Sequence, residues 1–360
     1  MPLPRFLLTA GLTCALSLAQ QSTQQTASEP IETPIERTTV NFVAAPVTVL
    51  DKSGAIVNGL QPAQFHLFDN GKEQNIAVDQ TFQPISMVIA IEASDRIDSI
   101  LTQIHKIGPL IEPLVIGDQG EAAVLAYDHR IQEMQPFTND STKIEKAIQK
   151  IHAGSTSSRM IDAIDRSVFM LRSKPPSHRR IILLIGETRD KGSEGKLKDA
   201  LVDAQISNVT IYAVDISQIS RRLTGKAQPP RPDPFPPAAR NLPGGAPNTP
   251  TTVAQATGLG GSAEFVPLLV EIYKDAKGIF VNNPVEIFTR GTGGSEFSFY
   301  KQRGLEKAIE SISEEIHSQY VITYNPNNKS EGGFHEISVQ LNRSDLKVQT
   351  RPGYWLASLK

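Results

Sequence analysis

Four short, unbroken apolar runs, separated by stretches of helical periodicity, constrain the fold of this chain more than any other feature. Unbroken runs of this length are typical of strands that are buried on both faces. Because helical stretches separate the runs, we expect an α/β fold with a doubly wound, mostly parallel sheet and helices on both faces. The runs are MVIAI (87–91), AAVLAY (122–127), IILLI (181–185) and VTIYAV (209–214).

Hydrophobic periodicity predicts the helices between these strands. Apolar residues recur three and four positions apart from Ile97 to Leu114, which is the spacing of an amphipathic helix. Asn139 or Asp140 would cap the next helix, and a strand at 130–137 would form a hairpin with the second apolar run. The other expected helices lie at about 140–151, 158–172, 193–207, 266–277 and 305–316.

Both ends of the chain carry strand patterns of another kind. Residues 38–83 are rich in β-branched residues and turns, and DNGK at 69–72 is a strong hairpin signal. The tail from Phe334 to Trp355 alternates apolar and polar residues, as antiparallel strands with one covered face do. An N-terminal unit of about 45 residues is marginal alone. We therefore expect it to form one small β module with the C-terminal strands, 326–360.

The first residues of the chain predict export. Arg5 precedes an apolar run that ends at Ala19, and SLA at 17–19 is similar to a signal-peptide cleavage site. We expect a signal peptide at 1–19, a linker at 20–37 and a periplasmic or secreted protein. A retained hydrophobic arm or anchor is the alternative. The run is shorter than the roughly 20 residues that span a bilayer, so we expect no transmembrane segment after signal removal.

Proline and cysteine usage add two expectations. Residues 229–250 hold 9 of the 25 prolines, which excludes a helix or a central strand there. We expect a proline-rich loop within a longer insertion, 219–294, and we interpret the glycines at 291–294 as loop flexibility. The single cysteine, Cys14, lies in the expected signal peptide, so a disulfide framework is excluded.

Charge and motif content exclude several classes of function. Lys and Arg number 36 against 38 Asp and Glu, a net charge of −2, which argues against a nucleic-acid-binding protein. The sequence contains no GxxxxGK[ST] or GxGxxG loop, no GxSxG elbow and no HExxH. No nucleophile–base pair can be recognised. We therefore expect a protein that is not an enzyme and has no catalytic residues.

The most informative polar residues follow two of the predicted strands. Glu92 and Ser94 come after the strand 87–91, and Glu187 comes after the strand 181–185. The carboxyl ends of parallel strands share one edge of a sheet, where ligands bind. The loop GSTSS (154–158) precedes a helix and would reach the same edge. Carboxylates and hydroxyls suit a hard divalent cation; the alternative is that these are ordinary turn and cap residues.

The order of these elements resembles a von Willebrand factor A (VWA) domain, and the chain is most similar to the VWA-related proteins of acidobacteria. The resemblance covers most of residues 38–360 except the proline-rich stretch. It is carried by VTVLDKSGAIVNGLQPAQFHLFDNGKEQNI, MVIAIEASDRI, GEAAVLAYDHRIQEMQPFTND, RRIILLIGETRDKGSEGKLKDAL, VTIYAVDIS, QYVITYNPNN and RPGYW, in this order.

The resemblance implies a metal-ion-dependent adhesion site (MIDAS), in which a DxSxS motif, a distant threonine and a second aspartate bind Mg²⁺ that accepts a partner carboxylate. Here DxSxS reads EASDR (92–96), and TDG reads GET (186–188). Thr156 best matches the threonine, with Ser155 or Ser158 as alternatives. The metal ligands would be Glu92, Ser94, Thr156 and Glu187.

This MIDAS is degenerate, because Arg96 replaces the second serine. A guanidinium cannot be a metal ligand, and its charge repels a cation. Arg96 could instead pair with Glu92 or Glu187. We therefore expect Mg²⁺ or Mn²⁺ to bind weakly or not at all, and no other cofactor. The face that would contact a partner comprises Glu92, Ser94, Asp95, Arg96, Ser155, Thr156 and Glu187.

The resemblance assigns residues 84–218 and 295–325 to a VWA-like domain, with the insertion between them. It implies an exported, non-enzymatic protein that binds another protein or a cell-surface component, such as a surface glycan, through the strand-end face. One alternative is a structural component of an envelope or surface assembly that makes its contacts through the β module. A metal-dependent hydrolase is a further alternative.

Overall fold

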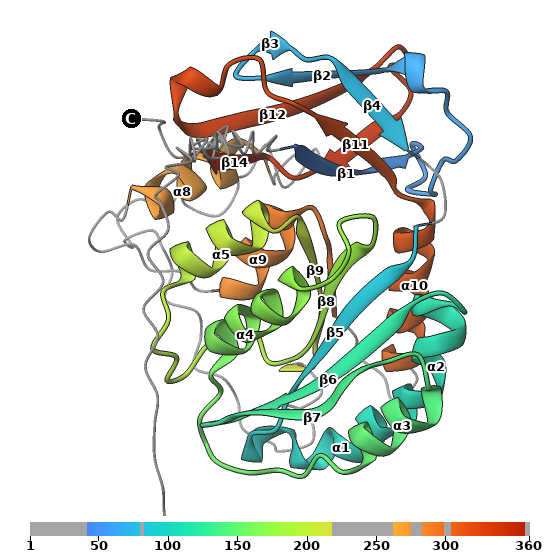
Figure 1. The fold of residues 1–360 in the computed structure, drawn as a ribbon, viewed down its shortest axis with the longest axis vertical. Coiled ribbons are helices and arrows are strands. Elements are labelled where there is room, and N and C mark those ends of the chain that lie inside the picture. Colours follow the sequence, from blue (N-terminus) through green and yellow to red (C-terminus); the bar gives the residue numbers. More distant parts are fainter. Residues whose placement is uncertain (1–41, 80–82, 218–261, 275–282, 299–303, 357–360) are drawn as a thin grey trace, which may run out of the picture. The chain divides into compact units, whose positions relative to one another are not determined.

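A six-stranded sheet with helices on both faces organises the larger part of the described chain (Figure 1). The expected signal peptide, linker and proline-rich stretch lie outside the residues described. The computed structural model describes residues 42–79, 83–217, 262–274, 283–298 and 304–356.

The sheet is mostly parallel, as predicted. Its strand order is β7-β6-β5-β8-β9-β10, and only β7 is antiparallel to its neighbour. The strands are β5 (Ile85–Glu92), β6 (Glu121–Tyr127), β7 (Ile131–Thr138), β8 (Arg179–Gly186), β9 (Val209–Asp215) and β10 (Glu296–Ser298). Numbered from β5, this is the 3-2-1-4-5-6 order common in doubly wound folds.

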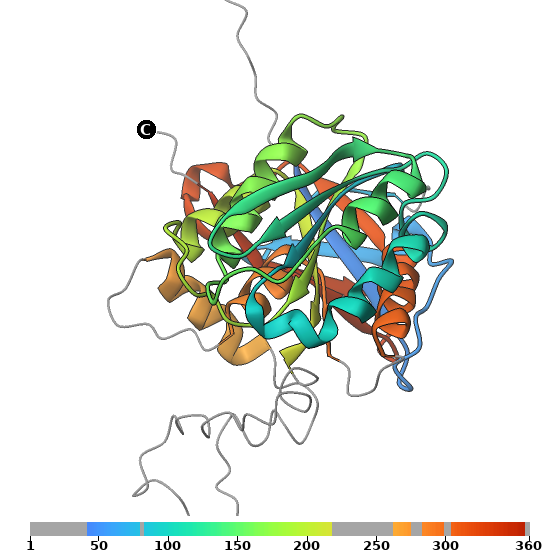
Figure 2. The same cartoon turned by 90° about the horizontal axis from the view of Figure 1, so that it is seen from below.

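The strand order fixes where a ligand site is expected. From β5 the chain builds β6 and β7 on one side and then returns to build β8 on the other side. The order therefore reverses between β5 and β8, whose residues Ile91 and Ile185 are in register. Ligands of open α/β sheets bind at the carboxyl ends of the strands at such a point. Figure 2 is seen from below Figure 1, the side toward which β5 points.

Alternate residues of β5 enter two separate cores, because side chains of a strand point to opposite faces. Met87, Ile89 and Ile91 pack in one core, and Val88 and Ala90 pack in the other. The first core is covered by α1 (Asp98–Ile104), α2 (Gly108–Ile111), α3 (Ser141–Gln149) and α10 (Gly304–Ser318). The second is covered by α4 (Met160–Arg172), α5 (Leu197–Ile206), α8 (Ser262–Tyr273) and α9 (Pro284–Thr292).

The helical stretch predicted from Ile97 onward is divided into short segments. Between β5 and β6 the chain forms α1 and α2 together with shorter helical turns. The turns are η2 (Asp95–Ile97), η3 (His105–Ile107) and η4 (Glu112–Ile116), the last of π type. None of the described helices combines the length and apolar content that crossing a membrane requires.

The expected insertion 219–294 and the flexible glycines need correction. Helices α8 and α9 contribute buried side chains to the second core, so these parts of the segment belong to the α/β layers. Gly293 ends α9 with a φ of 84°, a left-handed conformation that favours glycine. A Cβ on Gly294 would lie 2.2 Å from the carbonyl oxygen of Ile211. These two glycines therefore end a helix and allow close packing.

The two ends of the chain form the predicted β module, which consists of two four-stranded antiparallel sheets that share one core (Figure 1). At the predicted hairpin, Asn70 and Gly71 have φ values of 49° and 76° between β2 and β3. One sheet has the order β13-β1-β11-β4, formed by β13 (Lys347–Thr350), β1 (Val43–Leu50), β11 (Tyr320–Tyr324) and β4 (Ile76–Asp79). The other has the order β14-β12-β2-β3, formed by β14 (Gly353–Leu356), β12 (Gly333–Leu341), β2 (Phe65–Asp69) and β3 (Lys72–Glu73). A short turn, η1 (Pro62–Gln64), precedes β2, and η6 (Lys329–Glu331) precedes β12.

The placement of β11 differs from the expectation that 295–325 belongs to the α/β unit. β10 and α10 do lie there, but β11 pairs with β1 and β4 in the β module. Buried Tyr320, Ile322 and Tyr324 alternate with half-buried residues. This period of two is typical of a strand with one covered face, whereas β5 is buried throughout.

Candidate functional site

The carboxylate of Glu92 is buried at the end of β5 and is held by two hydrogen bonds. Its Oε1 accepts from the Ser94 hydroxyl at 2.6 Å, and its Oε2 accepts from the backbone N–H of Glu187 at 2.6 Å. Burial raises the pKa of Glu92, although both hydrogen bonds oppose this shift. The structure thus brings together residues predicted from the ends of two different strands.

An ion pair, partly exposed to solvent, lies near this buried carboxylate. Nη1 of Arg96 lies 2.9 Å from Oε2 of Glu187, with 29% of the Arg96 side chain and 13% of the Glu187 side chain exposed. The backbone N–H of Arg96 also donates to the Ser94 hydroxyl at 3.4 Å. Of the two pairings expected for Arg96, the structure has the one with Glu187.

The loop 154–158 is fixed beside this network by backbone bonds. The N–H of Gly154 donates to the carbonyl of Ala93 at 2.7 Å, and the N–H of Asp95 donates to the carbonyl of Ser155 at 2.9 Å. The N–H of Ser155 in turn donates to the buried carboxylate of Asp128 at 3.2 Å. A Cβ on Gly154 would lie 2.2 Å from that same carboxylate, so the loop can approach it only through a glycine.

Asp128 is a site residue that our sequence reasoning missed. It directly follows the buried strand β6, so the rule that selected Glu92 and Glu187 would also have found it. Burial alone would raise its pKa, but N–H groups of Arg130 and Ser155 and the side chain of His129 outweigh this and hold the pKa below its usual value. Asp128 therefore anchors the loop 154–158 as a carboxylate.

The three hydroxyls considered for the threonine position lie in different environments. Thr156 is exposed, and the Ser155 hydroxyl accepts from the backbone N–H of Ser157 at 3.3 Å. Ser158 is buried, and its hydroxyl has no hydrogen-bond partner among the described residues. Backbone bonds to Lys191 hold Ser158 against the loop that follows β8.

A second buried hydroxyl lies beside the Glu92 carboxylate. Tyr127 ends β6, and within the described part of the chain its hydroxyl has no hydrogen-bond partner. A Cβ on Gly186 would lie 2.5 Å from this hydroxyl and 2.7 Å from Oε2 of Glu92. Glycine at 186 therefore leaves room for both groups. Burial, together with the nearby charge of Glu92, raises the pKa of Tyr127 well above its usual value.

The loop after β8 is held rigidly on the first turn of α4. Asp190 accepts from the N–H of Ile161 at 3.0 Å, and the Ser193 hydroxyl accepts from the N–H of Asp162 at 3.2 Å. These bonds satisfy N–H groups that a helix start leaves without partners. Asp162 then accepts from the N–H of Gly195 at 2.8 Å. Glu187 therefore projects from a loop that is fixed at both ends.

The residues at this edge do not fit the divalent cation that the VWA resemblance implies. The Glu187 carboxylate is already neutralised by the Arg96 guanidinium at 2.9 Å. The same guanidinium acts on the Glu92 carboxylate, and its fixed positive charge repels a cation. In the described residues, no group of three or more His, Cys, Asp or Glu side chains is arranged to hold a metal ion.

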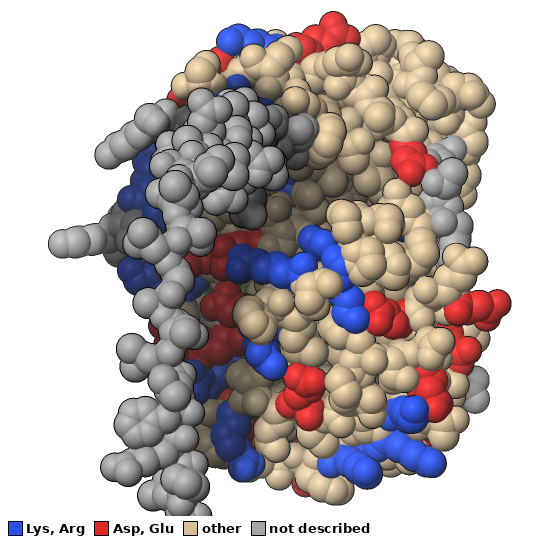
Figure 3. Space-filling view, viewed as in Figure 1, with Lys and Arg blue, Asp and Glu red and all other residues tan. Residues whose placement is uncertain are grey.

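An acidic cluster and an open groove are two further surface features of the described residues. Figure 3 shows acidic side chains gathered over α4 and α5. Asp165 of α4 lies close enough to Asp162, Asp199 and Asp203 for their charges to act on it. Burial, and then the charges of the other three carboxylates, raise the pKa of Asp165 to about 6. Asp162 is paired with Arg159 at 2.6 Å and Asp203 with Arg172 at 3.0 Å, so this acidic cluster does not by itself define a ligand site.

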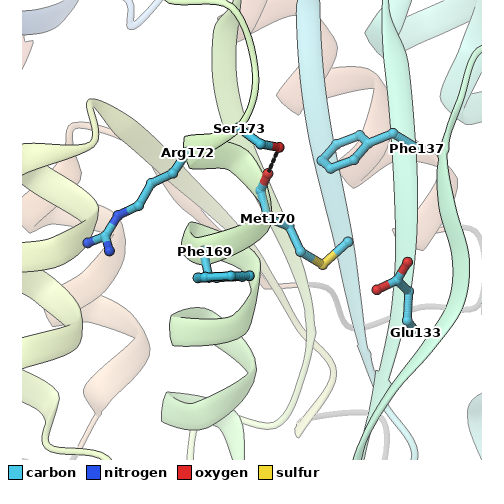
Figure 4. Close-up of a pocket in the computed structure, with 6 residues that line it drawn as sticks. All are labelled: Glu133, Phe137, Phe169, Met170, Arg172 and Ser173. Carbon is cyan, nitrogen blue, oxygen red and sulfur yellow. Dashed lines mark hydrogen bonds between the residues drawn. The ribbon is translucent and has the colours of Figure 1, made fainter. Parts of the chain in front are cut away.

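An open groove of about 540 Å³ lies between α4 and β7 (Figure 4). Phe137 and Met170 point into it, whereas Arg172 points away. Lys174 lies 3.8 Å from the centre of the Phe137 ring, so a cation already covers this aromatic face. Arg172 is one of the residues beside the groove, but only Glu133 and Ser173 direct polar side chains toward it. The groove therefore lacks the convergent polar groups of a small-molecule site.

The sequence matches no family model, and no curated protein matches it. The vWF domain of the type V pili tip protein Mfa5 from Porphyromonas gingivalis is 14% identical, with a TM-score of 0.26 over 29% of this chain and 38% of that chain. This chain thus spans less than two thirds of that protein's length.

Two further solved structures cover 64% of this chain each. The conserved hypothetical protein BatB from Bacteroides thetaiotaomicron is 13% identical, with a TM-score of 0.37 over 97% of its length. An aerotolerance-related membrane protein from Bacteroides fragilis is 16% identical, with a TM-score of 0.36 over 99% of its length. The fold described above follows from the strand order and core contacts of this chain itself.

Proposed function

We propose that this chain is a non-enzymatic interaction protein of the VWA type, whose strand-end face contacts another protein or a cell-surface component. The observation that carries the proposal is the rigid network of Glu92, Ser94, Arg96 and Glu187 at the point where the strand order reverses. A fixed arrangement of charges favours recognition of a partner, because little ordering is left to occur on binding.

Exposed side chains surround this network and would make the contacts. Asp95, Thr156, Arg189 and Lys191 are exposed on the three loops that meet there. They present both signs of charge around the partly exposed Arg96. Such a mixed polar surface is typical of the rim of a protein–protein interface. The expected export of the chain, which rests on its first 19 residues, would place this surface outside the cytoplasm.

The arrangement of potential nucleophiles supports a non-enzymatic role. Two serine–histidine contacts occur in the described residues, and the longer one, Ser313 Oγ to Nδ1 of His317 at 3.4 Å, joins successive turns of α10. The shorter one joins Ser86 Oγ to Nδ1 of His178 at 2.9 Å. Ser86 is completely buried at the amino end of β5, and its hydroxyl donates to Glu121 at 2.8 Å. A hydroxyl without access to solvent that already donates to a carboxylate is poorly placed to attack a substrate.

The proposal is tested by comparing retention of envelope proteins on the immobilised full chain and on variants. Asp95→Lys reverses an exposed charge beside the network, and Arg96→Glu reverses the central charge. Both variants should retain at least about tenfold less of any stoichiometric partner, since close charged pairs at interfaces are worth several kcal/mol.

The matched control is Glu336→Lys, which reverses an exposed charge on β12 of the β module. It should retain the partner as the wild type does. If Glu336→Lys loses the partner while both strand-end variants keep it, the contacts are made through the β module. That outcome would overturn the proposal and favour a structural component of an assembly.

A further inference from the structure

The positive charge beside Glu187 at the strand-end face is supplied by a side chain, the guanidinium of Arg96. Arg96 lies two residues after Ser94, on the short turn η2, and its guanidinium reaches across to the carboxylate that follows β8. It thereby bridges the two strand ends on either side of the point where the strand order reverses. This bridging between Glu92–Ser94 and Glu187 is what a bound cation would otherwise do.

The hydrogen bonds of the network are complete with the guanidinium in place. Both oxygens of Glu92 accept a bond, from the Ser94 hydroxyl and from the Glu187 N–H. Glu187 receives the charge of Arg96 at 2.9 Å. A charge-assisted bond from a guanidinium to a carboxylate is among the stronger polar contacts in proteins. No described carboxylate of this network is left without a donor.

We infer that the Arg96 guanidinium stands in place of a divalent cation, so that the strand-end face works without metal. This inference concerns the same face as the proposed function and deepens it. A neutral side chain at 96 would leave the Glu187 carboxylate without its guanidinium partner, beside the oxygens of Glu92 and Ser94. Removing one arginine should therefore turn this edge into a site for a hard cation.

The test is titration of Mn²⁺ into the full chain, with bound metal measured by calorimetry and free Mn²⁺ by electron paramagnetic resonance. The wild type should bind no stoichiometric Mn²⁺. Arg96→Ser should bind one Mn²⁺ per chain, at least about tenfold more tightly than the wild type, which is the size of effect that neighbours of metal ligands have. If Arg96→Ser does not fold, judged by circular dichroism, Arg96→Gln takes its place.

Three controls make the outcome specific. Arg96→Lys keeps the charge and should not gain Mn²⁺. Arg166→Ser removes another arginine that pairs with a carboxylate, Glu133 at 3.2 Å, and should gain none. Adding Glu187→Gln to Arg96→Ser should abolish the gained binding, because it removes one of the carboxylate ligands.

Two results would overturn the inference. One is stoichiometric binding to the wild type within about tenfold of Arg96→Ser, which would show that the guanidinium does not replace a cation. The other is no binding to any neutral variant, which would show that the guanidinium is not what excludes the metal. Neither measurement involves a partner, so its failure is distinguishable from failure of the proposed function.

Discussion

At the scale of single residues, small differences in side-chain length and charge determine what the strand-end face can do. The Glu92 carboxylate at the end of β5 accepts a hydrogen bond from the backbone N–H of Glu187, which follows the neighbouring strand β8, at 2.6 Å. Arg96 supplies charge where the VWA resemblance would place a serine ligand. The exchange of one residue type therefore changes the chemistry of the face without changing the sheet beneath it.

The titration of Asp165 gives a residue-scale prediction. Burial, and then the charges of Asp203, Asp162 and Asp199, raise the pKa of Asp165 from 3.8 to about 6. Between these pH values the folded chain holds a proton that the unfolded chain has released. The stability from this residue is therefore complete below about pH 3.8 and is lost as the pH rises through about 6.

Asp165→Asn should consequently be more stable than the wild type at pH 7, and the difference should shrink toward pH 4. Urea unfolding at both pH values measures this. Asp118→Asn, at an exposed turn, is the control and should show little change. An Asp165→Asn chain that is equally stable or less stable at pH 7 would contradict the assigned pKa shift.

At the scale of elements, strands and helices of strong periodicity were predictable from the sequence. The unbroken apolar run 87–91 predicted β5, because a strand buried on both faces is apolar throughout. The alternating tail predicted the antiparallel strands of the β module, because a strand with one covered face has a period of two. α9 was not predicted, since the formation of this helix depends on its packing against α5 and β9. The packing is close: a Cβ on Gly291 of α9 would lie only 2.9 Å from the Leu201 side chain of α5.

The candidate site was predictable only as a set of strand-end residues. The sequence placed Glu92 and Glu187 at one edge, and the structure brings them together. It could not distinguish Thr156 from Ser158, because hydroxyls two residues apart in a loop differ only in which one the loop turns inward. That choice depends on the backbone bonds of Ser158 to Lys191, which are not encoded in a local pattern.

In the β module, one buried carboxylate, that of Asp69, connects several strands. Asp69 at the end of β2 is fully buried and accepts from His335 at 2.7 Å. It also accepts from the hydroxyls of Tyr324 and Tyr354, at 2.9 Å each, and from Asn328 at 3.0 Å. One carboxylate thus satisfies groups from β11, β12 and β14 and joins the two sheets.

Asp69→Ala should destabilise the protein by about 3–5 kcal/mol, because the donors around it are left buried without partners. Tyr354→Phe removes one donor and should cost about 1 kcal/mol. Chemical denaturation of both variants measures the two losses. Equal losses would show that Asp69 is not the centre of this network.

At the scale of the whole described molecule, the contacts between the β module and the α/β layers leave the strand-end face uncovered. Gln205 of α5 donates to the carbonyls of Gly291 and Gly353 at 2.7 and 3.2 Å. The Tyr273 ring of α8 lies 5.3 Å from that of Trp355 in β14. The module therefore packs against the α5–α8 side of the sheet, and among the described residues it leaves the loops around Arg96 exposed.

The most direct test of a metal-free strand-end face is a crystal structure of the wild-type chain grown in Mn²⁺, with anomalous diffraction recorded at the manganese edge. Our account predicts no anomalous peak beside Glu92 and Ser94, and a guanidinium of Arg96 paired with Glu187. A manganese peak coordinated by Glu92 and Ser94, with Arg96 turned away from Glu187, would contradict it.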